Sequence, residues 1–228
     1  MSGSVVQSAI GINSAFATAI ATFGGSTTAG NLLVACCTYY QKTQFSSVSD
    51  SVGGGAGNSW VDAAAEVQGV QIGGRQQYAK NISNAGASHT VTLTISAANY
   101  PDIIAYEISG EDTTAPLDQQ DSTTVASTTT PVGNNKNVMA SGIAIAHGCD
   151  DTLLLTSFTM GAPWSVADKE QDHTGSNIGI VAGHQSVTVG GNPYHSAFTM
   201  NTARAAIIFM STYKDAAAAD TLFSQSCM

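Results

Sequence analysis

The stretch from residue 89 to residue 110 constrains the fold more than any other part of the chain. Three threonines alternate with three apolar residues over residues 90–95, which is the period-two pattern of a strand with one buried face. A turn at residues 99–101 follows, and residues 103–108 are then apolar apart from Glu107. Such a run is typical of a central strand covered on both faces. The stretch therefore predicts two strands of a β-sheet protein.

A similar arrangement recurs in the second half of the chain. Trp60 and Trp164 lie 104 positions apart, and Tyr106 and Phe209 lie 103 apart. The predicted strands and turns between these residues follow the same order, and the spacing is too long for a solenoid. We therefore predict an all-β fold, a jelly-roll-like antiparallel β-sandwich built from two similar Greek-key halves.

We expect a single β-sandwich over residues 1–214, with halves at about 24–110 and 138–214. Two separate domains of immunoglobulin size are the alternative. Residues 111–137 are rich in Thr, Asp and Pro, which predicts a long connection carrying at most one short strand. Residues 215–228 are expected to form a C-terminal tail or arm. Nothing in the chain predicts a helix longer than ten residues.

The charge of the chain restricts the classes of partner. Charged residues make up only 10% of the sequence, against about 25% in an average soluble domain, and the net charge is −9. Because no basic residues cluster, we expect neither a nucleic-acid partner nor an anionic membrane. No apolar run is long enough to span a bilayer, and the N-terminus lacks the basic region of a signal peptide. A surface that looks extracellular without an export signal favours a virion component made in the host cytoplasm.

The four cysteines fall into two groups. Cys36 and Cys37 are adjacent in a predicted strand, so they should face opposite sides, and with Cys149 they are expected to be buried small hydrophobes. Cys227 lies in the polar tail and is a candidate for an intermolecular disulfide; an unpaired tail thiol is the alternative. No Cys or His spacing predicts a zinc site, and no metal or other cofactor is expected.

Three glutamates invite comparison with a glycosidase. Glu66, Glu107 and Glu111 are candidates, but catalysis needs two carboxyl groups about 5–9 Å apart across a cleft. The alternative for Glu107 is that it accepts a hydrogen bond from Arg75, Lys80 or a backbone donor, or lies at a subunit contact. We predict no catalytic residue and no enzymatic activity.

Aromatic side chains offer a different chemistry. Several could stack on sugar rings if they share one exposed face. The candidate surface aromatics are Tyr39, Tyr40, Tyr100 and Tyr194. The two tryptophans are instead expected in the core. His89 and His195 hold equivalent places in the repeat, which indicates a structural role at the start of a strand.

Several short motifs resemble those of a widespread β-sandwich domain encoded by bacteria and their phages. These are AGNLLVACCTYY, VSDSVG, GNSWVDAA, RQQYAKNIS, SHTVTLTIS and IIAYEISGEDTTAPLDQ, and the likeness covers most of residues 27–215. The resemblance implies a jelly-roll-like fold and a phage structural or surface-binding protein. It attaches no activity to any residue.

Together these features predict a non-enzymatic phage virion protein. The first expectation is a capsid decoration or cement protein, or another head or tail surface component, that packs against other virion proteins and copies of itself. A carbohydrate-binding or adhesion module that recognises a host-surface glycan is the alternative. A polysaccharide-degrading enzyme is a weaker alternative.

Overall fold

The computed structural model describes residues 3–13, 16–42, 44–150, 158–161, 164–170, 180–191 and 193–217. These residues form antiparallel β-sheets and no helix, which confirms the predicted all-β, sandwich-like class. The jelly-roll and Greek-key connectivity stays a prediction. No helix that could cross a membrane occurs in the described part of the chain. The strands are β1 (Ser4–Ile12), β2 (Thr18–Thr22), β3 (Leu32–Tyr40), β4 (Phe45–Ser51), β5 (Val61–Gln68), β6 (Ile72–Ala79), β7 (Thr90–Ile95), β8 (Asp102–Ser109), β9 (Leu117–Thr128), β10 (Gly142–Asp150), β11 (Phe158–Met160), β12 (Ser165–Glu170), β13 (Ile180–Val187), β14 (Phe198–Met200) and β15 (Arg204–Lys214).

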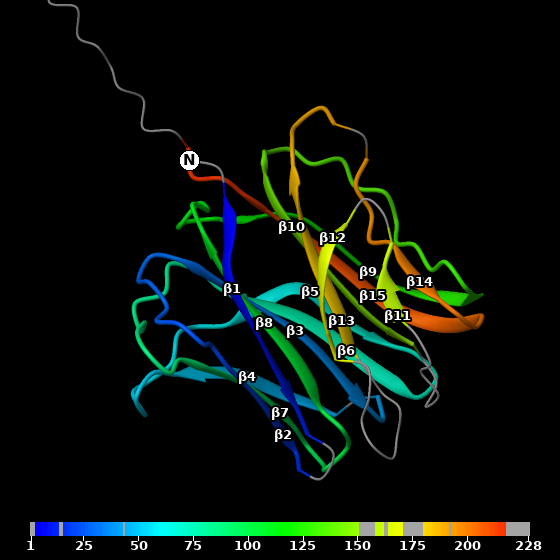
Figure 1. Cartoon of the computed structure of the whole chain (residues 1–228), viewed down its shortest axis with the longest axis horizontal. Helices are drawn as coiled ribbons and strands as arrows, with labels where there is room; N and C mark the ends of the chain where they lie inside the picture. Colours follow the sequence, from blue (N-terminus) through cyan, green and yellow to red (C-terminus); the bar gives the residue numbers. More distant parts are fainter. Residues whose placement is uncertain are drawn as a thin grey trace, which may run out of the picture.

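Two five-stranded sheets form the middle of the molecule (Figure 1). One has the order β1-β8-β3-β6-β5, and the other has the order β12-β13-β10-β15-β9. A three-stranded sheet, β2-β7-β4, covers the outer face of the first, and the pair β11-β14 packs beside the second. The second half thus repeats the strand order of the first, with β9, β15, β10, β13 and β12 in the places of β1, β8, β3, β6 and β5.

Apolar clusters fill the boundaries between the layers. The inward side chains of β7, Val91, Leu93 and Ile95, are buried against the first five-stranded sheet, while its threonines face out, as the alternation predicts. Strand β8 is buried on both faces, also as predicted. Apolar residues from both five-stranded sheets meet in a shared cluster that includes Val34, Tyr106 and Ile145. The two five-stranded sheets therefore share an apolar cluster at their boundary.

The cysteine predictions hold for the three residues that can be assessed. Cys36, Cys37 and Cys149 are buried. Cys37 packs toward the three-stranded sheet and Cys36 toward the second five-stranded sheet, so the adjacent pair faces opposite sides. Cys227 and residues 218–228 of the expected tail lie outside the described residues.

The segment expected to be a connection differs from the prediction. It contains β9, a strand of twelve residues that pairs with β15 along most of its length. The sequence of β9 is polar because the strand lies at the edge of its sheet, where Asp121 is its one buried residue. An edge strand needs little apolar surface, so its pattern resembles that of a loop.

Candidate functional site

A buried polar network connects the loops at one end of the first half. Asp50 Oδ2 lies 2.8 Å from His89 Nε2, and His89 Nδ1 lies 2.7 Å from the hydroxyl of Thr27. A hydroxyl, an imidazole and a carboxylate in this order resemble a nucleophilic triad. However, all three side chains are buried, and the Thr27 hydroxyl accepts a hydrogen bond from the Gly86 amide. The network therefore supports loops rather than presenting a nucleophile.

The same aspartate connects two of the sequence motifs, VSDSVG at residues 48–53 and GNSWVDAA at residues 57–64. Asp50 Oδ1 accepts hydrogen bonds from the Asn58 amide at 2.8 Å and from Trp60 Nε1 at 2.7 Å. The Asn58 side chain in turn accepts from the amides of Ser83 and Asn84. The segment from the end of β4 to the start of β5 is thus fixed by one buried carboxylate, which accepts hydrogen bonds from half-buried donors on Asn58 and Trp60.

Glu107 has three donors. Its carboxylate accepts hydrogen bonds from the Gln7 side chain at 2.6 Å, the Thr28 amide at 2.7 Å and the Asn31 side chain at 2.7 Å. A backbone donor was among the expected partners, and these contacts tie the loop before β3 to β1 and β8. The mid-strand carboxylate is therefore held by structural hydrogen bonds.

The candidate carboxylates do not form a facing pair. Glu66 lies on β5 and accepts the Tyr39 hydroxyl at 2.6 Å, whereas Glu107 lies on β8. In the sheet order, β8 and β5 are three strand spacings apart, which is about 14 Å at ~4.8 Å per strand. That separation is too wide for the carboxyl pair of a glycosidase.

Glu111 lies at a different place, where the two ends of the described chain meet. It forms a β-bridge with Asp215, and the Gly3 amide donates to Asp215 Oδ1 at 2.5 Å. Glu111 is buried, and neither of its carboxylate oxygens has a hydrogen-bond partner among the residues that the structure describes. Burial, with Asp215 nearby, raises the pKa of Glu111 to about 8. Burial beside Asp215 therefore favours the neutral, protonated form of Glu111.

The fold places the four candidate tyrosines in different environments. Tyr39 is buried in the core, so it does not belong to any surface patch, and its prediction as a surface aromatic is wrong. It faces inward because β3 is a central strand buried on both faces. Tyr194 is half-buried, and its hydroxyl accepts the Thr188 amide at 3.0 Å. Only Tyr40 and Tyr100 come together, with ring centroids 6.4 Å apart in an edge-to-face contact.

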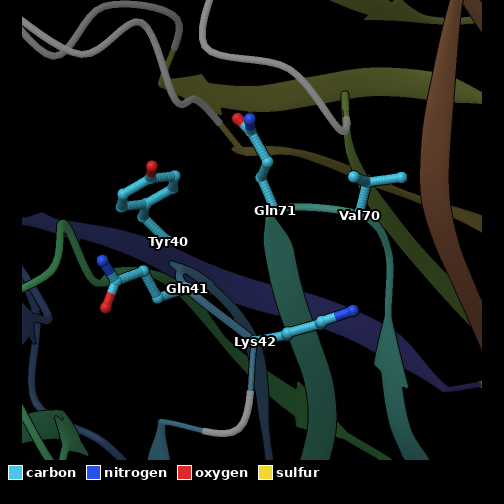
Figure 2. Close-up of a pocket in the computed structure, with 5 residues that line it drawn as sticks. All are labelled: Tyr40, Gln41, Lys42, Val70 and Gln71. Atoms are coloured by element: carbon cyan, nitrogen blue, oxygen red, sulfur yellow. The ribbon is translucent and has the colours of Figure 1, made fainter.

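A pocket adjoins this tyrosine pair. It has a volume of about 260 Å³ and is lined by Tyr40, Gln41, Lys42, Val70 and Gln71. Figure 2 shows the side chains of Tyr40 and Gln71 projecting to the same side, while Lys42 extends below Val70. A second hollow of about 600 Å³ shares Lys42 and Val70 and reaches β9. An aromatic ring, two amides and one ammonium are suitable groups for contacting a sugar.

The outer face of the three-stranded sheet carries regularly spaced hydroxyl groups, and we call it the hydroxyl face. Its strands are aligned so that outward-facing residues form three rows across β4, β7 and β2. The rows are Ser47-Thr94-Thr18, Ser49-Thr92-Ile20 and Ser51-Thr90-Thr22. All nine side chains are exposed or half-buried, and none is charged. The face offers hydroxyl groups and one exposed isoleucine.

Comparison with known proteins identifies no relative. No protein-family model, no curated protein and no solved structure matches the chain. Its function must therefore be inferred from the surfaces described above.

The sequence analysis did not predict that these three strands form one surface. The alternation over residues 90–95 was visible, and TAIAT in β2 and SVSDS in β4 have the same period. The missing information was the pairing of β4, β7 and β2, which brings segments up to 76 positions apart in register at Thr18 and Thr94.

Proposed function

We propose that this chain is a non-enzymatic structural protein of a phage virion. It would be a capsid decoration or cement protein, or another head or tail surface component, that packs against other virion proteins. The observation that supports this proposal is the hydroxyl face. Eight hydroxyl groups and Ile20 form an aligned, uncharged surface over three strands.

The character of the face suits packing against another protein. Charged residues are depleted at the centres of protein interfaces, because burying them costs desolvation energy. The hydroxyl face carries no charge, although the whole chain has a net charge of −9. Hydroxyl groups can both donate and accept hydrogen bonds, so they can match many backbone partners on a neighbouring protein.

The distribution of carboxylates and histidines supports a packing role as well. Asp50, His89 and Glu107 are used in hydrogen bonds that hold loops. Glu66 accepts the hydroxyl of a buried tyrosine. These groups stabilise the sandwich that presents the outer surface.

A particle-binding experiment tests the proposal. Purified phage particles that lack the chain are mixed with wild-type protein or with Thr92→Glu, which places a charge at the centre of the hydroxyl face. Wild type should co-sediment with the particles at a fixed stoichiometry, and the variant should bind at least about tenfold more weakly, a loss of ~1.4 kcal/mol. Ser127→Glu, on the exposed part of β9, is the matched control and should bind like wild type. Absence of the chain from purified native particles, by mass spectrometry, would reject the proposal.

A carbohydrate-binding module is the second candidate, and the pocket beside Tyr40 and Tyr100 favours it. In this case a glycan array should give a defined set of bound sugars, and Tyr40→Ala should abolish binding because the stacking surface is lost. Tyr194→Ala is the control, because Tyr194 lies outside the pocket. A blank array with wild-type protein would remove this candidate.

A further inference from the structure

The two hollows beside Lys42 adjoin each other. Lys42 and Val70 line both of them, so the smaller hollow at Tyr40 leads to the larger one, which reaches residues 124–126 of β9. The larger hollow has a volume of about 600 Å³, within the range of ~300–1,000 Å³ that is common for small-molecule sites. We call the two hollows together the Lys42 groove. It runs from the loop after β3, past the turn between β5 and β6, to the edge of the second half.

Charge distinguishes this groove from the rest of the chain. Among the described residues, Lys42 is the one charged residue that lines it, although the chain as a whole has a net charge of −9. The other cations whose side chains the structure describes are each held by a carboxylate or a carbonyl oxygen, and they are Arg75, Lys80, Lys136, Arg204 and Lys214. The ammonium of Lys42 has no such partner within the described part of the chain. A cation of this kind, in a groove without a carboxylate, favours an anionic ligand.

The backbone beside the groove has an uncommon conformation. Gln41, which lines the groove, and Tyr100, whose ring contacts Tyr40, have φ values of 58° and 48°. These values lie in the left-handed region, which a bulky residue rarely adopts. The Gln41 amide donates to the Gln71 carbonyl at 2.7 Å, which holds the loop after β3 against the start of β6. Conformations of this kind concentrate at ligand-binding sites, where the surrounding structure maintains them.

We propose that the Lys42 groove binds an acidic sugar chain. The carboxylate or phosphate of one sugar pairs with the ammonium of Lys42, and another sugar contacts the ring of Tyr40. The inference rests on the second candidate function, the carbohydrate-binding module, and names the ligand class of that site.

The lining of the groove suits a chain of sugars better than a small free anion. Gln41, Gln68 and Gln71 contribute side-chain amides, which both donate and accept hydrogen bonds as sugar hydroxyls do. Figure 2 shows that the side chain of Lys42 extends below Val70, on the side away from Tyr40. A small anion would therefore contact the ammonium alone, whereas a chain of sugars reaches the ring and the amides as well.

The net charge of the protein confines an acidic sugar chain to this groove. Because carboxylates outnumber cations in the chain as a whole, an acidic ligand is repelled by most of the surface. Salt screens the attraction of an exposed ammonium, since the Debye length falls from about 10 Å at 0.1 M to about 3 Å at 1 M. Binding of an acidic sugar should therefore weaken as the ionic strength rises.

A glycan array with matched acidic and neutral probes tests the ligand class. The probes are oligogalacturonates with their methyl esters, sialylated oligosaccharides with their desialylated forms, and phosphorylated mannose oligosaccharides with their dephosphorylated forms. Wild type should bind at least one acidic probe about tenfold more tightly than its neutral counterpart. The probe that binds also shows whether a carboxylate or a phosphate supplies the anionic group.

Calorimetric titration of that acidic probe then tests the groove. Lys42→Gln should weaken binding about three- to fivefold and remove most of its salt dependence. Lys80→Gln is the matched control, because it changes the net charge equally at an exposed position outside the groove. Ala126→Glu should weaken binding by repulsion, and Ser127→Glu, at an exposed position that does not line the groove, should have a smaller effect. Circular dichroism establishes that each variant is folded.

The results separate this inference from the function on which it rests. Binding of neutral probes alone, or acidic binding that Lys42→Gln leaves unchanged, overturns the acidic ligand while the carbohydrate-binding module stands. An array on which wild type binds no probe overturns both. Thr92→Glu, on the hydroxyl face, should bind the acidic probe like wild type. An equal loss from Thr92→Glu and Lys42→Gln would place the sugar outside the groove and overturn the inference.

Discussion

The imidazole of His147 stacks on the ring of Phe209, with centroids 4.4 Å apart and planes 3° apart. His147 belongs to β10 and Phe209 to the neighbouring β15, where they are directly paired. The Nδ1 atom of His147 lies 3.5 Å from the side-chain nitrogen of Gln76, which belongs to the first half. The contact therefore places a titratable group at the junction of the two five-stranded sheets.

This position makes the stability of the protein sensitive to acid. Burial lowers the pKa of His147 from 6.5 to about 3, because the charged imidazolium loses its hydration. The unfolded chain binds the proton first, so the free energy of unfolding should fall as the pH drops from 6.5 toward 3, by up to about 1.4 kcal/mol per pH unit. Urea titrations across this range should show a shallower slope for His147→Phe.

Glu111 should make the protein less stable as the pH rises. Its pKa is raised from 4.5 to about 8, so the folded protein keeps a proton that the unfolded chain has lost. Stability should therefore fall as the pH rises from 4.5 to 8, by a few kcal/mol at most. Glu111→Gln should remove this loss and be more stable than wild type at pH 9. Unchanged melting temperatures of this variant across that range would contradict the assignment.

Asp112 provides the contrast for that experiment. Hydrogen bonds from the amides of Ala115 and Thr114 lower its pKa, so its contribution is present above pH 3.8 and lost in acid. Asp112→Asn should therefore change stability at neutral pH. It should not affect the fall in stability that Glu111 causes between pH 4.5 and 8.

Gly11 should not tolerate a side chain. A Cβ at this position would lie 2.3–2.6 Å from the backbone of Ile20 and Ala21, because β1 and β2 cross closely there. Gly11→Ala should cost about 1–3 kcal/mol, as overpacking of a core does. Gly24→Ala is the matched control, since a Cβ there meets no atom within 4 Å. Thermal melts of the two variants measure the difference.

Asp50 should be among the most important polar residues for stability. Asp50→Ala leaves the buried imidazole of His89 and half-buried donors on Asn58 and Trp60 without their acceptor, which should cost about 1–3 kcal/mol. Asp62→Ala removes an ion pair with Arg75 that is partly exposed to solvent, so it should cost less than about 1 kcal/mol. If urea unfolding shows that both variants lose a similar free energy of unfolding, the buried network is no more important for stability than the partly exposed ion pair.

The parts of the fold that depend on local pattern could be predicted from sequence. The alternation over residues 90–95 has a fixed period because successive side chains of a strand point to opposite faces. The same geometry gave the opposite orientations of Cys36 and Cys37. Strand β9 could not be found in this way, since an edge strand needs few apolar residues.

The amino-acid sequence by itself determined that this protein is built of strands, which of its faces are apolar, and that residues 1–41 have no charged side chain. Only the tertiary structure decided that Asp50 meets His89, that Glu66 and Glu107 lie on separate strands, and that Tyr39 is buried while Tyr40 borders a pocket. The physical reason is that strand periodicity is local, whereas hydrogen-bond partners and exposed edges depend on which strands pair across the chain.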